Sequence, residues 1–285
     1  MKKIFIYTLL SCLFLIACEP VEDSKELTGS ITADEIVATV KAEVADNGKT
    51  VNKVILDCSS PILCKWSNGV ESAVGAHAEL KMFALGEQTI TLTGLCKDGT
   101  FITRDYTVNI EEMKYEIEPQ YAYFCGDGEK KWTWDSQVAK PWGNGGYGND
   151  MGPAWWCMSP EEIDADIAGN NRTQWLGEGV NATMTFVLNG MKLIKSSGKE
   201  GTFYFDMTQK ITKTDANGNV VDWSIGKLYT NGTDVLFGMI ANDWISATEY
   251  DILVLDDQQM VLAAPCVAGA GWNEGTFWCF RAINE

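Results

Sequence analysis

The chain alternates short strand-like runs with turn signals along nearly its whole length, which limits what it can fold into. In the first part, residues 37–44 and 51–58 alternate apolar and polar side chains on either side of Asp46-Asn47-Gly48. Residues 88–93 and 101–110 form a second pair around an Asp-Gly turn. Such alternation sends successive side chains to opposite faces of a strand. About 80 residues with this pattern predict a small β-sandwich.

The second part, residues 113–285, repeats the pattern with more strands and turns such as Asn189-Gly190. Only residues 160–168 are typical of a helix, because Ser159 suits the N-cap and Pro160 the first helical position. The candidate strands are residues 121–124, 131–135, 182–188, 202–207, 223–229, 235–240, 249–255, 260–264 and 276–282. Strands at this spacing favour an antiparallel jelly-roll β-sandwich or a lipocalin-like barrel. We therefore predict an all-β protein with two domains.

The first domain carries a partial family signature. Residues 54–60, Lys65-Trp66-Ser67-Asn68-Gly69 and residues 85–92 resemble a PKD-type immunoglobulin-like domain over residues 30–112. In that family a Trp-x-Phe-Gly-x-Gly segment is typical, and here Ser67-Asn68-Gly69 replaces its fuller form. The resemblance implies a spacer domain in which Trp66 lies in the core.

The amino terminus resembles a bacterial lipoprotein signal. Lys2 and Lys3 precede an apolar run over residues 4–16, which is too short to span a bilayer comfortably. Leu15-Ile16-Ala17-Cys18 looks like a lipobox. The resemblance implies that residues 1–17 are a signal peptide, that cleavage precedes Cys18, and that Cys18 is acylated. Its acyl chains would then anchor the protein in a membrane.

Residues 18–29 follow as an acidic segment with almost nothing apolar to bury, which predicts a solvated linker. The segment also resembles the tether by which Bacteroidetes lipoproteins reach the outer face of the outer membrane. We therefore expect a lipid-anchored outer-membrane protein that faces the cell exterior. Attachment to the periplasmic leaflet is the alternative.

Charge and residue usage exclude several classes of function. The formal net charge is −17, so phosphate backbones should repel the chain and we expect no nucleic-acid partner. The single histidine, His77, excludes most histidine metal sites and a serine triad, and we expect it on the surface. Seven cysteines remain after Cys12 and Cys18, so at least one thiol stays unpaired within the chain. We expect no cofactor.

Tryptophans divide into two groups by their sequence context. Trp132 and Trp134 alternate on one strand face, as do Trp278 and Phe280, which predicts core packing for both pairs. Trp223 and Trp244 stand beside strands and could belong to either group. A second group lies in or beside sequence rich in Gly, Pro and Asn, which we interpret as loops. Its members are Trp142, Tyr147, Trp155, Trp156 and Trp272.

Aromatic side chains on loops are typical of surfaces that bind sugars, because an electron-rich ring attracts the C–H groups of a pyranose face. Adjacent Trp155 and Trp156 cannot both face a core if the chain is extended there. Asn144, Asp150 and Glu274 would supply hydrogen bonds to hydroxyl groups if these loops converge. The alternative is a large loop that packs against the domain through its own aromatic side chains.

Two further interpretations concern carboxylates. Asn149 and Asp150 could join backbone carbonyls around a structural Ca²⁺. Glu162-Ile163-Asp164-Ala165-Asp166 resembles the Glu-x-Asp-x-Glu signature of laminarinase-type glycosidases, whose carboxylates share one strand face. Against catalysis, the third acid is Asp instead of Glu, and Ser159-Pro160 starts a helix.

Together these patterns predict a non-catalytic surface lipoprotein that binds a polysaccharide or oligosaccharide, within a glycan-uptake system that includes outer-membrane transporters or surface hydrolases. Lys131–Asp135 near the start of the second domain and Phe277–Arg281 at its end resemble a C-terminal domain found in Bacteroidetes surface lipoproteins, mostly presumed to bind glycans. The alternatives are a structural or protein-interaction lipoprotein and, third, a laminarinase-type glycoside hydrolase.

Overall fold

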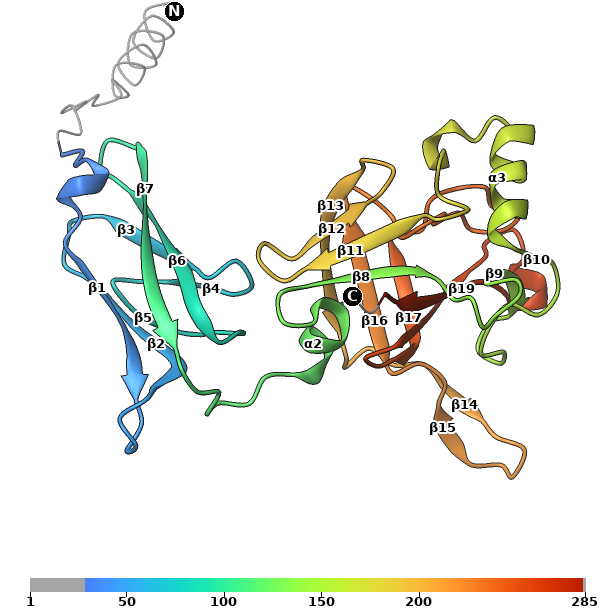
Figure 1. The fold of residues 1–285 in the computed structure, drawn as a ribbon, viewed down its shortest axis with the longest axis horizontal. Helices are drawn as coiled ribbons and strands as arrows, with labels where there is room; N and C mark the ends of the chain where they lie inside the picture. The colour runs from blue at the N-terminus through green and yellow to red at the C-terminus, as the bar shows by residue number, and fades with distance from the viewer. Residues whose placement is uncertain (1–28, 284–285) are drawn as a thin grey trace, which may run out of the picture.

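A computed structural model of the protein describes residues 29–283 and shows two all-β domains joined by a short linker (Figure 1). The predicted signal peptide, Cys18 and nearly all of the predicted tether lie outside the described residues. Between residues 29 and 283, no helix has both the length and the apolar character needed to cross a membrane.

The first domain is an immunoglobulin-like sandwich of two antiparallel sheets, as predicted. The short 3-10 helix η2 (Ala33–Glu35) precedes it. One sheet has the order β1 (Ala38–Val44), β2 (Thr50–Cys58) and β5 (His77–Lys81). The other has the order β4 (Ser72–Val74), β3 (Leu63–Ser67), β6 (Gly86–Leu95) and β7 (Phe101–Ile110). Trp66 is fully buried between the sheets, and the side chain of His77 is exposed, so both predictions are confirmed.

The second domain is an eight-stranded barrel in which each strand pairs with the next along the chain. Its strands are β8 (Glu129–Trp134), β11 (Thr183–Val187), β12 (Lys192–Lys195), β13 (Glu200–Asp206), β16 (Gly226–Asn231), β17 (Glu249–Leu255), β18 (Gln259–Pro265) and β19 (Glu274–Ala282). Pairing of β19 with β8 closes the barrel. A meander of this kind decides between the two predicted topologies in favour of the lipocalin-like barrel over the jelly roll.

Side chains fill the interior of this barrel. Trp132, Trp134, Trp278 and Phe280 all lie in the core, as their alternation predicted. The helix α2 (Pro119–Cys125) adds Phe124, which packs against rings from β11 and β13. An eight-stranded barrel is just wide enough for its own side chains to fill, so ligands are expected on its surface.

Two predicted strands of the second domain are wrong. Residues 121–124 belong to α2, because Pro119 starts a helix that buries Phe124 and Cys125. Residues 235–240 form a buried irregular segment in which Phe237 has a φ of 42°, outside the β region of backbone conformations. The predicted helix is confirmed as α3 (Pro160–Gly169), with a capping box between Ser159 and Glu162.

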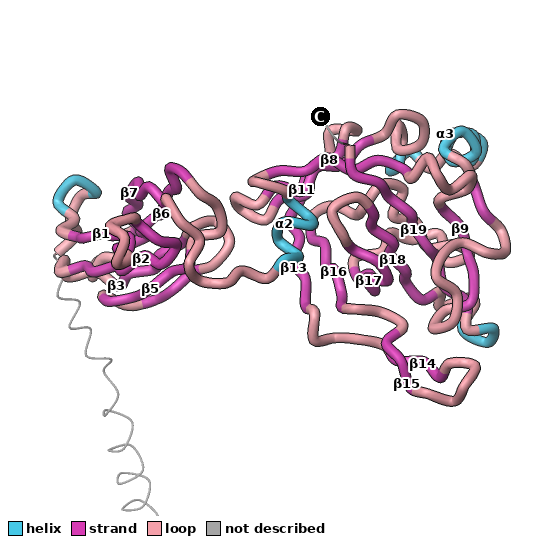
Figure 2. The backbone as a smooth tube through the Cα atoms, turned by 60° about the horizontal axis from the view of Figure 1, so that its bottom comes forward, coloured by secondary structure: helices cyan, strands magenta, loops and turns pink. Residues whose placement is uncertain are grey.

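The expectation of a flexible Gly/Asn loop is also wrong over residues 142–146. These residues form β9 (Trp142–Gly146), which pairs with the first half of β19 and with β10 (Cys157–Met158). Its glycines permit close packing: a Cβ on Gly143 would stand 2.3 Å from the carbonyl oxygen of Trp156. The small hairpin of β14 (Thr212–Thr214) and β15 (Val220–Asp222) projects from the barrel (Figure 2).

The two domains touch through the β11–β12 hairpin and α2. The amide of Gly190 donates to the carbonyl oxygen of Gly69 at 2.9 Å. Phe83 of the sandwich stacks edge-on against Tyr121, with ring centroids 4.7 Å apart, and Tyr121 stacks against Phe205 in the same way. This end of the barrel therefore faces the sandwich, and the connections over residues 135–182, 232–248 and 266–273 emerge at the opposite end.

Candidate functional site

Three long connections gather at the barrel end opposite the β11–β12 hairpin, because neighbouring strands run antiparallel. They are residues 135–182, which include β9, β10 and α3, residues 232–248 and residues 266–273. The last connection contains the 3-10 helix η4 (Ala270–Trp272), and the first contains η3 (Thr173–Trp175). Loops held by a rigid scaffold are where binding residues concentrate.

Four tryptophans on these connections are exposed, and we call them the aromatic rim. Their exposed fractions are 54% for Trp155, 41% for Trp156, 44% for Trp244 and 79% for Trp272. The rings of Trp156 and Trp244 meet edge-on with centroids 6.2 Å apart, so two of the connections touch through these side chains. The Arg172 guanidinium lies 4.2 Å from the centroid of the Trp244 ring and fixes its orientation.

A buried polar network fastens the connections together beneath the rim. The carboxylate of Glu274 accepts a hydrogen bond from Asn144 at 2.5 Å and another from Asn242 at 2.6 Å. Asn144 in turn accepts from the backbone amide of Trp156 at 2.7 Å. Because Asn144 and Asn242 come from two different connections and both bond to Glu274 at the start of β19, this network sets where the loops sit relative to one another.

Backbone contacts add to this attachment. The carboxylate of Asp243 accepts from the amides of Val267 and Ala268, both at 2.6 Å. The amide of Tyr147 donates to the carbonyl oxygen of Asn273 at 2.6 Å. The loop that carries Trp272 is therefore bonded to both neighbouring connections, and the rim is a fixed surface.

For three of the predicted ligand-binding residues, the expected surface exposure is wrong. Trp142 is fully buried, and its indole N–H donates to the carbonyl oxygen of Met239 at 3.2 Å. Asn144 and Glu274 are only 7% and 6% exposed, and they bond to each other within the network. The physical reason is the pairing of β9 with β19, which turns this segment inward as part of the sheet.

Tyr147 and Asp150 are half-buried and are already engaged by the protein. The hydroxyl of Tyr147 donates to Asp251 at 2.5 Å, and its ring packs edge-on against Trp223. The carboxylate of Asp150 accepts from the amide of Gly146 at 2.7 Å and from the side chain of Asn149 at 2.9 Å. Among residues 29–283, no group of three or more His, Cys, Asp and Glu side chains is placed to hold a metal ion.

The structure assigns Trp244 to the rim and Trp223 to the core, although both were ambiguous in the sequence. Asn242 and Trp244 both have positive φ, so the chain turns sharply at this point and presents the indole outward. The segment Asn242-Asp243-Trp244 was the available signal, because Asn and Asp favour such turns.

The carboxylates of the glycosidase-like segment lie on α3 and do not share a strand face. Glu162 pairs with Lys140 at 2.9 Å. Asp164 accepts from the amides of Gly179 and Val180. Asp166 pairs with Arg172 at 2.7 Å, and this pair supports the guanidinium that lies over Trp244. Asp166 therefore helps to hold Arg172 in place over the ring of Trp244.

The interface between the domains also holds two cavities, of about 510 Å³ and about 270 Å³, both lined by Phe83, Ala84, Asp127 and Leu188. These residues belong to the contact between sandwich and barrel described above.

Comparisons with known proteins found structural similarity to PKD1 domains over part of the chain. No family model matches the chain, and no curated protein matches it. Among solved structures, the PKD1 domain of the Vibrio cholerae metalloprotease PrtV is similar, with 18% identity and a TM-score of 0.23 over 27% of this chain and 95% of that one. The PKD1 domain of Vibrio anguillarum Epp shows 16% identity and a TM-score of 0.22 over 27% of this chain and 93% of that one. The immunoglobulin-like assignment rests on the strand order of the domain itself.

Proposed function

We propose that the protein is a non-catalytic surface lipoprotein that binds a polysaccharide or oligosaccharide at the aromatic rim. The observation that carries this proposal is the exposure of four tryptophans on loops that a buried network fastens together. A large indole left in water is costly unless it meets a partner, and exposed apolar surface of this kind marks interaction sites. Trp155, Trp156, Trp244 and Trp272 provide it here.

A sugar fits the chemistry of this surface. Pyranose faces present C–H groups to the indole ring, and such stacking requires rings whose orientation is fixed in advance. Arg172 and the Trp156–Trp244 contact supply this order. An open surface gives modest affinity per site, which a repeating polysaccharide would raise by engaging several anchored copies of the protein.

The remaining parts of the chain suit the same function. The lipobox that ends in Cys18 would anchor the protein in the outer membrane, and the acidic segment would carry it to the exterior as in Bacteroidetes surface lipoproteins. The PKD-type sandwich would act as a spacer, since it occupies the barrel end opposite the rim. An outer-membrane transporter or a surface hydrolase would then take the captured glycan.

The test is retardation of the protein in native gels that contain laminarin, xylan, dextran, amylopectin or galactomannan. We expect at least one polysaccharide to retard the wild type, and Trp244→Ala and Trp155→Ala to weaken retardation by about tenfold, since one stacked ring contributes of the order of 1–2 kcal/mol. Phe101→Ala is the matched control, because Phe101 is an exposed aromatic residue on the sandwich, away from the rim.

Equal retardation of the wild type and both tryptophan variants would place the binding site elsewhere. Failure of every polysaccharide would instead favour the second candidate function, contact with a partner protein. One observation supports that alternative: Ile245 and Val267, which flank the rim, are 55% and 78% exposed and have no role in sugar stacking.

A further inference from the structure

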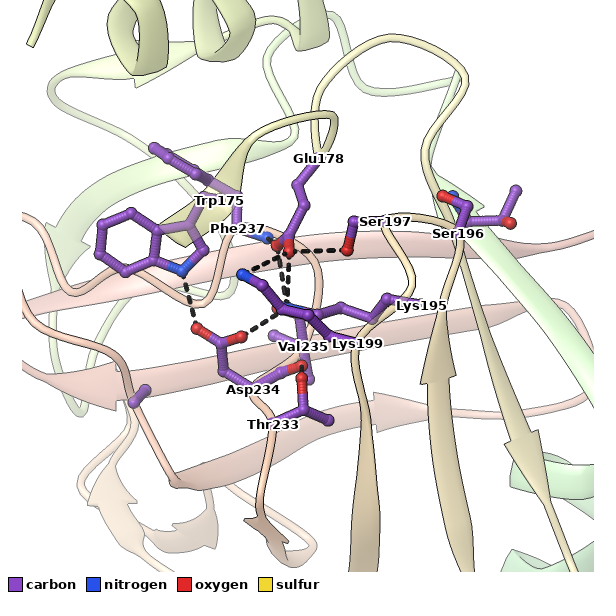
Figure 3. Close-up of polar contacts among 12 residues, drawn as sticks. Trp175, Glu178, Lys195, Ser196, Ser197, Lys199, Thr233, Asp234, Val235 and Phe237 are labelled. Carbon is purple, nitrogen blue, oxygen red and sulfur yellow. Dashed lines mark hydrogen bonds and ion pairs between the residues drawn. The ribbon is translucent and has the colours of Figure 1, made fainter. Parts of the chain in front are cut away.

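A lysine lies fully buried between two carboxylates at the rim end of the barrel, and the cluster plays no part in the proposed binding surface. Lys195 stands at the end of β12, and its side chain has no exposed surface. Its Nζ atom lies 2.8 Å from Glu178 and 2.5 Å from Oδ1 of Asp234. Figure 3 shows these three side chains pointing toward one another from separate segments of the chain.

The other atoms of the two carboxylates are held in place by protein donors. The indole N–H of Trp175 donates to Oδ2 of Asp234 at 2.7 Å (Figure 3). The backbone amide of Phe237 donates to Oε2 of Glu178 at 2.8 Å, and the hydroxyl of Ser197 donates to Oε1 at 3.1 Å. Asp234 is therefore oriented with one oxygen on the amine and the other on the indole.

This arrangement is costly as a set of ions. Removing a lysine and two carboxylates from water costs several kcal/mol per ion, and well-packed apolar side chains would stabilise a fold equally well. Burial already raises the pKa of the neighbouring Tyr250 far above its usual range, and the charge of Asp234 adds to the effect. The Lys195 amine and the Asp234 carboxylate are held in direct contact in this buried site.

We propose that Lys195 and Asp234 condense to an intramolecular amide bond. A proton first passes from the Lys195 ammonium to the Asp234 carboxylate, which leaves a neutral amine and a carboxylic acid in contact. The lone pair of Nζ then forms a bond to Cγ of Asp234, and the C–O bond to the hydroxyl group breaks. The products are one amide and one water molecule. The reaction needs no oxidant and no added reactant, and it leaves the net charge of the cluster unchanged.

Two neighbours act on the reacting atoms. Glu178 touches Nζ with its carboxylate, so it can accept a proton from the attacking amine and return it to the departing hydroxyl group. The Trp175 indole donates to the carboxyl oxygen that becomes negative in the tetrahedral intermediate, which is the role of an oxyanion hole. A cavity of about 290 Å³ beside Asp234 and Thr233 gives the released water a way out.

The bond would fasten β12 to the connection that carries Trp244. Lys195 and Asp234 are separated by 39 positions in the sequence, so the cross-link would close a long loop of the unfolded chain. It would also prevent residues 232–248 from opening away from the barrel. The cross-link would therefore add to the rigidity of the rim without touching a ligand.

Peptide mapping of the full-length protein tests the proposal. Trypsin should fail to cleave after Lys195, and residues 193–199 should appear joined to residues 228–281 in one branched peptide. Its mass should be about 18 Da below the sum of the two linear peptides. Cleavage after Lys195 in the folded wild type, with residues 193–195, 196–199 and 228–281 recovered as separate linear peptides, overturns the proposal and leaves an ionic cluster.

Three variants separate the chemistry from the fold. Glu178→Gln removes the proton carrier, and we expect the branched peptide to fall by at least about tenfold. Asp234→Asn should still react, but with loss of ammonia, which lowers the branched peptide by about 17 Da relative to its linear parts. Ser197→Ala is the matched control and should keep the wild-type branched peptide.

A branched peptide of undiminished amount in Glu178→Gln would remove Glu178 from the mechanism and contradict its assigned role. If Glu178→Gln does not fold, the peptide maps of the wild type and of Asp234→Asn still decide whether the amide bond forms. None of these measurements depends on glycan binding, so this proposal and the proposed function fail separately.

Discussion

The contact between Tyr147 and Asp251 shows how burial sets the chemistry of a single residue in this barrel. The Tyr147 hydroxyl donates to Oδ2 of Asp251, whereas Oδ1 is buried and has no hydrogen-bond partner among the described residues. Burial raises the pKa of Asp251, and the hydrogen bond from Tyr147 only partly opposes the effect. Burial and the adjacent carboxylate together raise the pKa of Tyr147.

This pKa shift predicts a pH dependence of stability. Because Asp251 holds its proton more tightly in the folded state, its contribution is fully present at low pH and is lost as pH rises through the folded pKa. We expect the wild type to lose free energy of unfolding relative to Asp251→Asn as pH rises from 3.8, the ordinary pKa of the carboxyl, through the raised pKa of the folded state. Urea unfolding of both proteins across this range measures the difference. A gap that does not change with pH would contradict the prediction.

At the scale of elements, β9 depends on glycine for close approach. A Cβ on Gly143 would stand 2.3 Å from the carbonyl oxygen of Trp156 and 2.6 Å from Cα of Cys157, and both are backbone atoms that cannot move aside alone. This contact places β10 and the preceding loop, which carries Trp155 and Trp156, against β9. The position of β9 therefore sets the position of half of the rim.

We therefore expect Gly143→Ala to lower the free energy of unfolding by about 1–3 kcal/mol, since overpacking shifts the backbone. It should also weaken polysaccharide retardation by displacing Trp156. Gly271→Ala is the matched control, because a Cβ there meets no atom within 4 Å. Equal stability of the two variants, measured by urea unfolding, would show that β9 and β10 tolerate a wider spacing.

For the whole molecule, the question is whether sandwich and barrel act as one body. Phe83 packs against the barrel core and stacks on Tyr121, while Gly69 and Gly190 are joined by a backbone hydrogen bond. These contacts hold the sandwich at the barrel end opposite the rim. Under the proposed function, a sandwich that is fixed in this way would present the rim away from the membrane.

We expect Phe83→Ala to release part of this contact, with a loss of about 1–2 kcal/mol in the free energy of unfolding. Small-angle scattering should then show a larger radius of gyration, because the linker lets the domains separate. Phe101→Ala, on an exposed site of the same domain, should leave the scattering profile unchanged. An unchanged profile for Phe83→Ala would mean that the remaining contacts hold the domains together.

Some parts of the fold and site followed from local sequence patterns. Period-two alternation placed Trp132 and Trp134 correctly in the core, and the Ser159-Pro160 start of α3 needed only neighbouring residues. Residues 121–124 were predicted as a strand, although a run of four apolar and aromatic residues fits a strand and a helix equally well. The burial of Phe124 against the barrel favours the helix that the structure shows.

The candidate site was harder to predict, because its exposure depends on contacts between distant segments. Trp142 and Trp155 lie in similar Gly- and Pro-containing sequence, yet pairing of β9 with β19 buries the first and leaves the second in solvent. Asn144 and Glu274 come together across 130 positions of sequence. No local pattern specifies such an encounter.

The sequence by itself determined the all-β class, the immunoglobulin-like sandwich and the core strands, because alternation and turn residues act over a few neighbours. Tertiary structure alone decided that the barrel closes, through the pairing of β19 with β8, and which tryptophans form the rim. It also brought Lys195, Glu178 and Asp234 together. Closure and burial are set by contacts between residues far apart in the chain, and these contacts form only when the whole barrel packs.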